Sequence, residues 1–162
     1  MTVPGPGRSR SACCALLLAL ALAGCASTPQ GSPERDATAK AFGTHPGHSA
    51  IYVYRPAPES NSDWEETVLY LNHRLIGATL PQTYFRVDVE PGEYVLGGAG
   101  VDQGKFELKP RTRPDELYFV ELRVTGGVSS YRLVDAETGK RAIRECCTLM
   151  ENWAPGQRPL LR

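Results

Sequence analysis

Five cysteines are the residues of this chain best suited to covalent chemistry, and they occur in three groups. Cys13 and Cys14 lie within an apolar run, Cys25 follows that run, and Cys146 and Cys147 are adjacent. Neighbouring α-carbons lie about 3.8 Å apart, below the usual disulfide range of about 4.4 to 6.8 Å, so a bridge between Cys146 and Cys147 is expected to be strained and easily reduced. A redox pair and pairing with another chain both stay open. The third reading is structural, with one cysteine in the core and one on the surface, because neighbours on a strand point to opposite faces.

The segment before Cys25 has the three-part layout of a secretory signal. Arg8 and Arg10 give it a positive start, residues 12–23 are apolar, and small residues precede Cys25. The apolar part is 12 residues long, whereas a helix needs about 20 to cross a bilayer. The segment therefore predicts export of the chain rather than a stable membrane span.

The run Leu22-Ala23-Gly24-Cys25 resembles the lipobox of bacterial lipoproteins. The resemblance implies that the Cys25 thiol receives a diacylglycerol group, that cleavage makes Cys25 the first residue, and that its new amino group is acylated. Several acyl chains would anchor the protein stably, because each buried methylene contributes about 0.8 kcal/mol. Since Ala26 rather than an aspartate follows, the resemblance implies the outer membrane, facing the periplasm, in a cell with two membranes. An ordinary secretory signal that leaves Cys25 free is the alternative.

Length and charge limit the number of domains and the kinds of partner. The 138 residues after residue 24 suit one domain with its own core. The chain has 18 basic and 18 acidic residues, and residues 1–24 contain Arg8, Arg10 and no acid, so 16 and 18 remain. This balance gives no electrostatic footprint for nucleic acid or for anionic headgroups. We therefore expect no nucleic-acid partner.

Residues 26–47 are rich in small and polar residues and lack apolar periodicity, which predicts a flexible tether spanning on the order of 25 Å. The predicted organisation is a signal peptide at 1–24, a tether at 25–47, a domain at 48–150 and a tail at 151–162. His45 and His48 could offer two imidazoles to a metal ion. Because Pro46-Gly47 bends the chain between them and no third ligand lies nearby, we expect a plain loop, with no metal and no cofactor.

From Ala50 onward, short apolar segments alternate with turn residues about every ten positions, which predicts an all-β sandwich of antiparallel strands. In residues 117–124, every second side chain is apolar, so these side chains are expected to share one face of a strand and to point into the core. They are Tyr118, Val120, Leu122 and Val124. Asn72 and His73 separate two apolar segments. Both residue types tolerate positive φ, which suits a tight hairpin turn.

Residues 135–140 separate two further segments and predict a hairpin loop with Gly139 in the left-handed conformation. The apolar residues that follow also recur at helical spacing; they are Ala142, Ile143, Cys146, Cys147 and Met150. Strand and helix therefore both stay open for residues 141–150.

Residues 48–147 resemble the bacterial DUF2846-type lipoprotein domain. The resemblance is carried by Ala50-Ile51-Tyr52-Val53-Tyr54-Arg55, by a strand, turn and strand over 68–77, by Val89-Glu90-Pro91-Gly92-Glu93-Tyr94, and by Leu117-Tyr118-Phe119-Val120. The chain departs from the pattern at Asn72-His73, where a turn containing glycine is commoner. The resemblance implies an envelope location and a sandwich-like fold, and it implies no reaction.

The loop that contains Trp64 between Asp63 and Glu65 is the predicted contact surface, because a large aromatic in a polar loop is typical of interfaces. The alternative is that Trp64 covers the sandwich edge. We expect a non-catalytic, lipid-anchored protein that binds an envelope protein or polysaccharide, since no nucleophile signature accompanies the three histidines. The second hypothesis is a redox- or metal-responsive envelope protein that uses Cys146 and Cys147.

Overall fold

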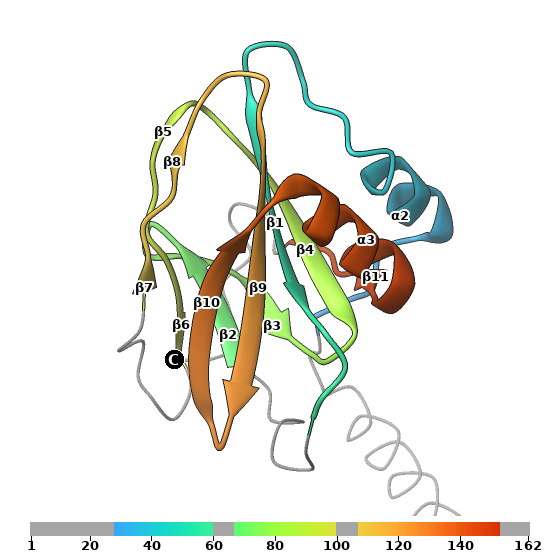
Figure 1. Cartoon of the computed structure of the whole chain (residues 1–162), viewed down its shortest axis with the longest axis vertical. Coiled ribbons are helices and arrows are strands. Elements are labelled where there is room, and N and C mark those ends of the chain that lie inside the picture. The colour runs from blue at the N-terminus through green and yellow to red at the C-terminus, as the bar shows by residue number, and fades with distance from the viewer. Residues whose placement is uncertain (1–27, 60–66, 100–106, 153–162) are drawn as a thin grey trace, which may run out of the picture.

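The computed structural model describes residues 28–59, 67–99 and 107–152. Strands dominate this part of the chain and form two main sheets that face each other (Figure 1). The five-stranded sheet has the order β10-β9-β1-β4-β11 and the four-stranded sheet the order β3-β2-β6-β7. The predicted all-β fold is confirmed.

The strands of the two main sheets are short. The five-stranded sheet consists of β1 (Ser49–Arg55), β4 (Thr83–Val89), β9 (Leu117–Thr125), β10 (Val128–Val134) and β11 (Thr148–Leu149). The four-stranded sheet consists of β2 (Thr67–Leu71), β3 (Arg74–Thr79), β6 (Leu96–Ala99) and β7 (Glu107–Leu108). A two-stranded ribbon pairs β5 (Gly92–Glu93) with β8 (Arg111–Thr112). The described helices are α2 (Pro33–Ala39) and α3 (Ala136–Cys146).

The five-stranded sheet is mixed rather than purely antiparallel. β1 runs parallel to β9, and β11 runs parallel to β4. Parallel neighbours need a long crossover connection. Between β1 and β9, the chain forms β4 and the strands of the other sheet, and this long stretch is the crossover. Apolar alternation within each strand indicates which face is buried but does not indicate the direction of its neighbour.

The core between the two sheets contains the apolar side chains of residues 117–124 that were predicted to face it. Val120 and Leu122 are fully buried there, with Tyr118 packed at the margin. The other buried members come from both sheets, namely Ile51, Val53, Leu69, Leu71, Ile76, Phe85, Val89, Leu96, Val124 and Met150. The hairpin is also confirmed, because Asn72 and His73 have φ of 48° and 62° between β2 and β3.

A second apolar cluster lies on the outer face of the five-stranded sheet, where α2 and α3 cover it (Figure 1). Tyr52 stacks on Phe119 with ring centroids 5.1 Å apart, and its hydroxyl donates to the Ala39 carbonyl at 2.7 Å. Burial raises the pKa of Tyr52 to about 12. The helices thus shield an aromatic surface that would otherwise face water.

The predicted tether is wrong over its described part, residues 28–47. Ser32 caps α2 by accepting from the Arg35 N–H, and Pro33 occupies the first turn. Phe42, beyond the helix, is only 8% exposed. Two buried apolar side chains, Ala39 and Phe42, fix this segment, and two residues are too few to produce a periodic pattern.

The hairpin loop predicted at residues 135–140 is also wrong. Asp135 caps α3 by accepting from the Thr138 N–H at 2.9 Å, and Ile143 is fully buried. The helical alternative is correct as far as Cys146, after which the chain enters β11. Gly139 lies inside the helix rather than in a left-handed turn, because α3 approaches Phe119 closely at this position.

Gly139→Ala is expected to destabilise the domain by about 1 to 3 kcal/mol, because a Cβ there would overlap the side chain of Phe119. In an exposed helix the same change would stabilise by about 1 kcal/mol, so the sign of the effect tests the contact. Thermal unfolding followed by circular dichroism measures it. Gly43→Ala is the matched control, since its Cβ would meet no atom within 4 Å. Equal melting temperatures for the two variants would contradict the packing of α3 on Phe119.

Candidate functional site

Four residues with predicted roles lie outside the described part of the chain. They are Cys25, the predicted lipid attachment site, and the predicted contact residues Asp63, Trp64 and Glu65. Their roles stay predictions. Among residues 28–59, 67–99 and 107–152, no helix is long and apolar enough to cross a membrane.

The two adjacent cysteines are joined by a disulfide at the point where α3 ends and β11 begins. Cys147 is 4% exposed, and its sulfur lies 3.6 Å from the Arg55 carbonyl oxygen. Cys146 is half-buried and packs against the cluster on the outer face of the sheet. The prediction of two separate thiols, one in the core and one on the surface, is therefore wrong.

A groove of about 480 Å³, which the sequence did not predict, lies on the surface of the described domain. It lies between α2 with the residues that follow it and β11 with the residues that follow that strand. Ala39, Leu149 and Met150 contribute buried apolar atoms to its lining. The Ser-Pro pair at residues 32–33 is typical of a helix start, and it is a local signal from which α2 alone could have been predicted.

Charged side chains at the rim of the groove are already paired. Arg35 bonds Glu151 at 2.9 Å, and Arg86 bonds Asp88 at 2.8 Å while also donating to the Gly43 carbonyl at 2.9 Å. Exposed pairs of this kind contribute at most about 1 kcal/mol of stability. They position the rim without leaving a net charge on it.

Asn152 is a polar residue in the lining of the groove. Its Nδ2 donates to the Arg86 carbonyl at 2.8 Å, whereas its buried Oδ1 has no hydrogen-bond partner among the described residues. A buried acceptor without a donor costs about 1 to 3 kcal/mol. Because that oxygen is itself buried, a ligand in the groove does not reach it, and the groove offers an apolar lining bordered by paired charges.

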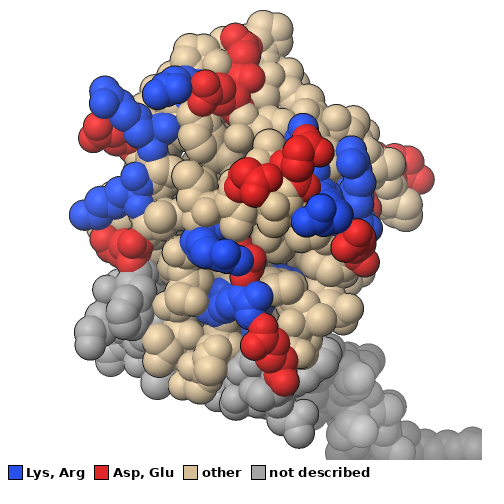
Figure 2. Space-filling model, viewed as in Figure 1, with Lys and Arg blue, Asp and Glu red and all other residues tan. Residues whose placement is uncertain are grey.

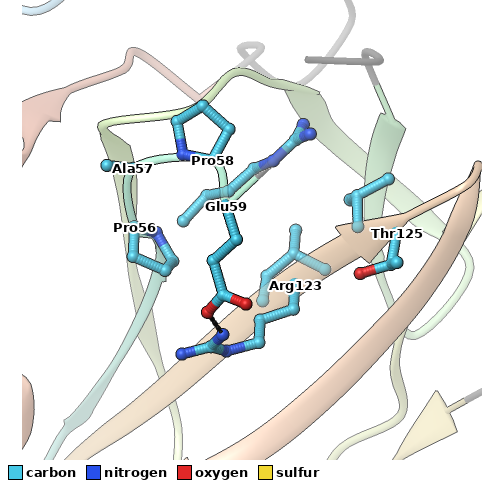
Figure 3. Close-up of a pocket in the computed structure, with 9 residues that line it drawn as sticks. Pro56, Ala57, Pro58, Glu59, Arg123 and Thr125 are labelled. Carbon is cyan, nitrogen blue, oxygen red and sulfur yellow. Dashed lines mark hydrogen bonds and ion pairs between the residues drawn. The ribbon is translucent and has the colours of Figure 1, made fainter. Parts of the chain in front are cut away.

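A second, much smaller pocket lies where residues 56–59 cross the end of β9 (Figure 3). Glu59 reaches across it to form an ion pair with Arg123, and Pro56 and Pro58 shape the opposite wall. Its volume is about 30 Å³, which is comparable to the share of one water molecule in the liquid. This pocket has no room for an organic ligand.

Glu121 is the centre of a charge network on the outer face of β9 and β10. Its carboxylate pairs with Arg123 and with Arg132 at 2.8 Å, and it accepts from the Tyr54 hydroxyl at 3.2 Å. Burial alone would raise the pKa of Glu121, but the hydrogen bonds from the two arginines outweigh it and hold that pKa below its usual value. Its contribution to stability is therefore present at neutral pH and is lost as the pH falls through its folded-state pKa.

The network extends to Glu59 through Arg123, and opposite charges lie close together on this face (Figure 2). Glu121 and Arg132 are direct cross-strand partners, the arrangement in which opposite charges stabilise a sheet. Because every charge in the network has a partner, we interpret it as structural rather than as a catalytic centre.

The comparisons with known proteins found one similar sequence and no described function. A Haemophilus influenzae protein, described as "Uncharacterized protein", is 28% identical over 131 residues, which is 78% of this chain and 76% of that protein. No family model and no solved structure matches the chain. The resemblance to the DUF2846-type domain therefore stays a prediction.

Proposed function

We propose that the protein is a lipid-anchored component of the bacterial envelope that binds a partner, without catalysis, in the groove between α2 and β11. The signal segment and the Leu-Ala-Gly-Cys run support the anchor. The groove supports the binding role, because ligand sites combine an apolar lining with a few placed polar groups. The proposed location is the outer membrane, facing the periplasm.

The composition of the groove favours a polypeptide segment over a polysaccharide as the partner. Among the described residues that line it, His45 carries the single ring, so the lining offers little surface on which sugars could stack. The apolar lining that Leu149 and Met150 contribute suits an aliphatic side chain. The paired ions at the rim would stay satisfied after binding. The observation that carries the binding proposal is the apolar lining of a groove whose charged rim residues are already paired.

Ala41→Trp is expected to reduce partner capture several-fold without changing the melting temperature, because Ala41 is exposed and lines the groove. The measurement is the yield of cross-linked partner that co-purifies with the tagged full chain from membranes. Ala37→Trp is the matched control, since Ala37 is an exposed alanine of α2 that does not line the groove. Equal capture by both variants would contradict the groove as the binding site. Trp64→Ala in the same assay tests the other predicted contact surface.

The disulfide supports a second candidate function, a redox-responsive envelope protein. Reduction would take two electrons and two protons from a dithiol, which becomes a disulfide, and would convert the Cys146–Cys147 bond into two thiols. The bond joins residues that a peptide bond already connects, so its cleavage would relax only the local backbone at the junction between α3 and β11, two residues before Leu149 of the groove. This proximity supports the second candidate.

The redox function predicts that partner capture differs between the oxidised and the reduced protein. Capture is measured before and after treatment with dithiothreitol, and the thiol state is read by alkylation and mass spectrometry. The variant with Cys146→Ser and Cys147→Ser is expected to behave like the reduced protein under both conditions. If all four samples capture the partner equally at matched stability, the disulfide is structural and the second function is wrong.

A further inference from the structure

The folded domain begins closer to the predicted lipid site than the tether prediction allowed. Thr28 is 6% exposed, and its Oγ1 accepts from the Ala78 N–H at 2.8 Å. The next residues lie beside β11, because the Glu151 N–H donates to the Pro29 carbonyl and the Gly31 N–H donates to the Leu149 carbonyl, each at 2.8 Å. The domain is therefore held from residue 28 onward.

Because the domain is held from residue 28 onward, it cannot move far from an acylated Cys25. This inference rests on the proposed lipid anchor. Thr28 follows Cys25 by three residues, and three residues span at most about 11 Å. The headgroup layer of one leaflet is itself roughly 5 to 8 Å thick, from the difference between the total and hydrocarbon thickness of a bilayer. A domain on so short a connection is held against the headgroups instead of being lifted clear of them.

The strand register identifies which end of the sandwich lies at this point. Ala78, the partner of Thr28, is in the last part of β3, and Leu80 follows that strand. Arg55 at the end of β1 pairs with Thr83, so β1 finishes at this end too. The hairpin between β9 and β10 also lies here, because β9 runs parallel to β1 (Figure 1). We call this surface the anchor end and define it as residues 56–59, 80–82 and 125–128.

The chemistry of the anchor end suits a lipid surface. Leu80 and Val128 are 39% and 42% exposed, and they are two of the three exposed large hydrophobic residues in the described chain. Among the described residues that define the anchor end, Glu59 carries the one charge, and Arg123 neutralises it. Interfacial binding grows with the apolar area that is buried in the lipid.

The opposite end of the sandwich has a different character. It contains the loop around His48, whose imidazole bonds Glu90 at 2.9 Å, and the loop around Arg113 and Glu116. Ionised side chains at that end would lose hydration against a bilayer. The two ends thus differ in the way expected for a protein that stands on a membrane in one orientation.

We propose that the anchor end rests on the bilayer surface, with Leu80 and Val128 inserted among the lipid headgroups. The anchor and these two side chains together fix the orientation of the sandwich on the membrane. The end with His48 then points away from the lipid. The partner of the anchor end is a phospholipid surface, not a second protein.

Hydrogen exchange measured by mass spectrometry on the full chain in vesicles of phosphatidylethanolamine and phosphatidylglycerol tests this proposal. The comparison is a chain with a Gly/Ser insertion of about 20 residues between Ser27 and Thr28, which adds roughly 25 Å of flexible reach. Peptides that cover the anchor end are expected to exchange several-fold more slowly in the natural chain than in the insertion variant. Peptides that cover residues 45–48 and 113–116 are expected to exchange equally in both.

Two substitutions separate lipid contact from changes in folding. The variant with Leu80→Asp and Val128→Asp is expected to lose the protection of the anchor end. Leu133→Asp is the matched control, because Leu133 is 50% exposed on β10 and five residues from Val128, about 17 Å along the strand. It is expected to keep that protection.

The intact mass of each sample distinguishes the two ways in which the proposal can fail. If the acyl mass is present and the anchor end exchanges equally in the natural and insertion chains, the lipid contact is wrong while the anchor stands. If the acyl mass is absent, the proposed anchor is wrong and the inference falls with it.

Discussion

Cys25→Ser is expected to remove the acyl chains and to release the protein from washed membranes almost completely. The thiol is the proposed acylation site, and a hydroxyl does not replace it in the chemistry that the lipobox resemblance implies. The remaining apolar segment of 12 residues is too short to hold the chain across a bilayer as a helix. Fractionation by alkaline extraction and the intact mass of the N-terminal peptide measure the outcome.

Cys14→Ser is the control for this experiment, because Cys14 lies inside the same segment but is not preceded by Leu-Ala-Gly. It is expected to leave both the acyl mass and membrane attachment unchanged. Wild-type protein found wholly in the soluble fraction, or a Cys25→Ser variant that keeps its acyl mass, would show that the anchor is not at this residue.

Val120→Asp is expected to leave the domain largely unfolded at 25 °C. Val120 is fully buried between the two sheets, and a carboxylate there would have no partner and no water. Substitutions of this kind cost more than about 4 kcal/mol, against a total stability of about 5 to 15 kcal/mol for a typical domain. Far-ultraviolet circular dichroism and urea titration would detect the loss.

Leu133→Asp is the control that shows whether Val120→Asp unfolds the domain because the charge is buried, or because any charge on this sheet does so. Leu133 is the direct cross-strand partner of Val120, yet it is 50% exposed. The same charge placed there stays hydrated, so a loss of at most about 1 kcal/mol is expected. Similar unfolding of both variants would mean that the space between the sheets is not the core.

The sequence predicted the sheet faces correctly because alternation depends on burial alone. Val120 and Leu122 lie in the core between the two sheets, as the apolar alternation at residues 117–124 predicts. The turn at Asn72-His73 was predictable because few residue types adopt positive φ. Strand direction was not predictable, since the pairing of β1 with β9 depends on residues more than 60 positions away in the chain.

The groove could not be predicted for a related reason. Its walls come from α2 and β11, and each is too short to give a periodic signal. Met150 appears in the sequence as one more apolar residue, and Asn152 as part of the tail. Their shared position depends on the bridge between Gln30 and Met150, which no local pattern encodes.

If the chain is exported as proposed, the bridge between Gln30 and Met150 affects the order in which the domain can be completed. A chain that crosses a membrane from its N-terminus delivers residue 30 long before residue 150. The segment around Gln30 must wait for β11, and β1 must wait for β9, before either gains its partner. Contacts between such distant positions slow folding. In a chain exported as proposed, the pairing of these two segments would therefore form last, when nearly all of the chain has been translocated.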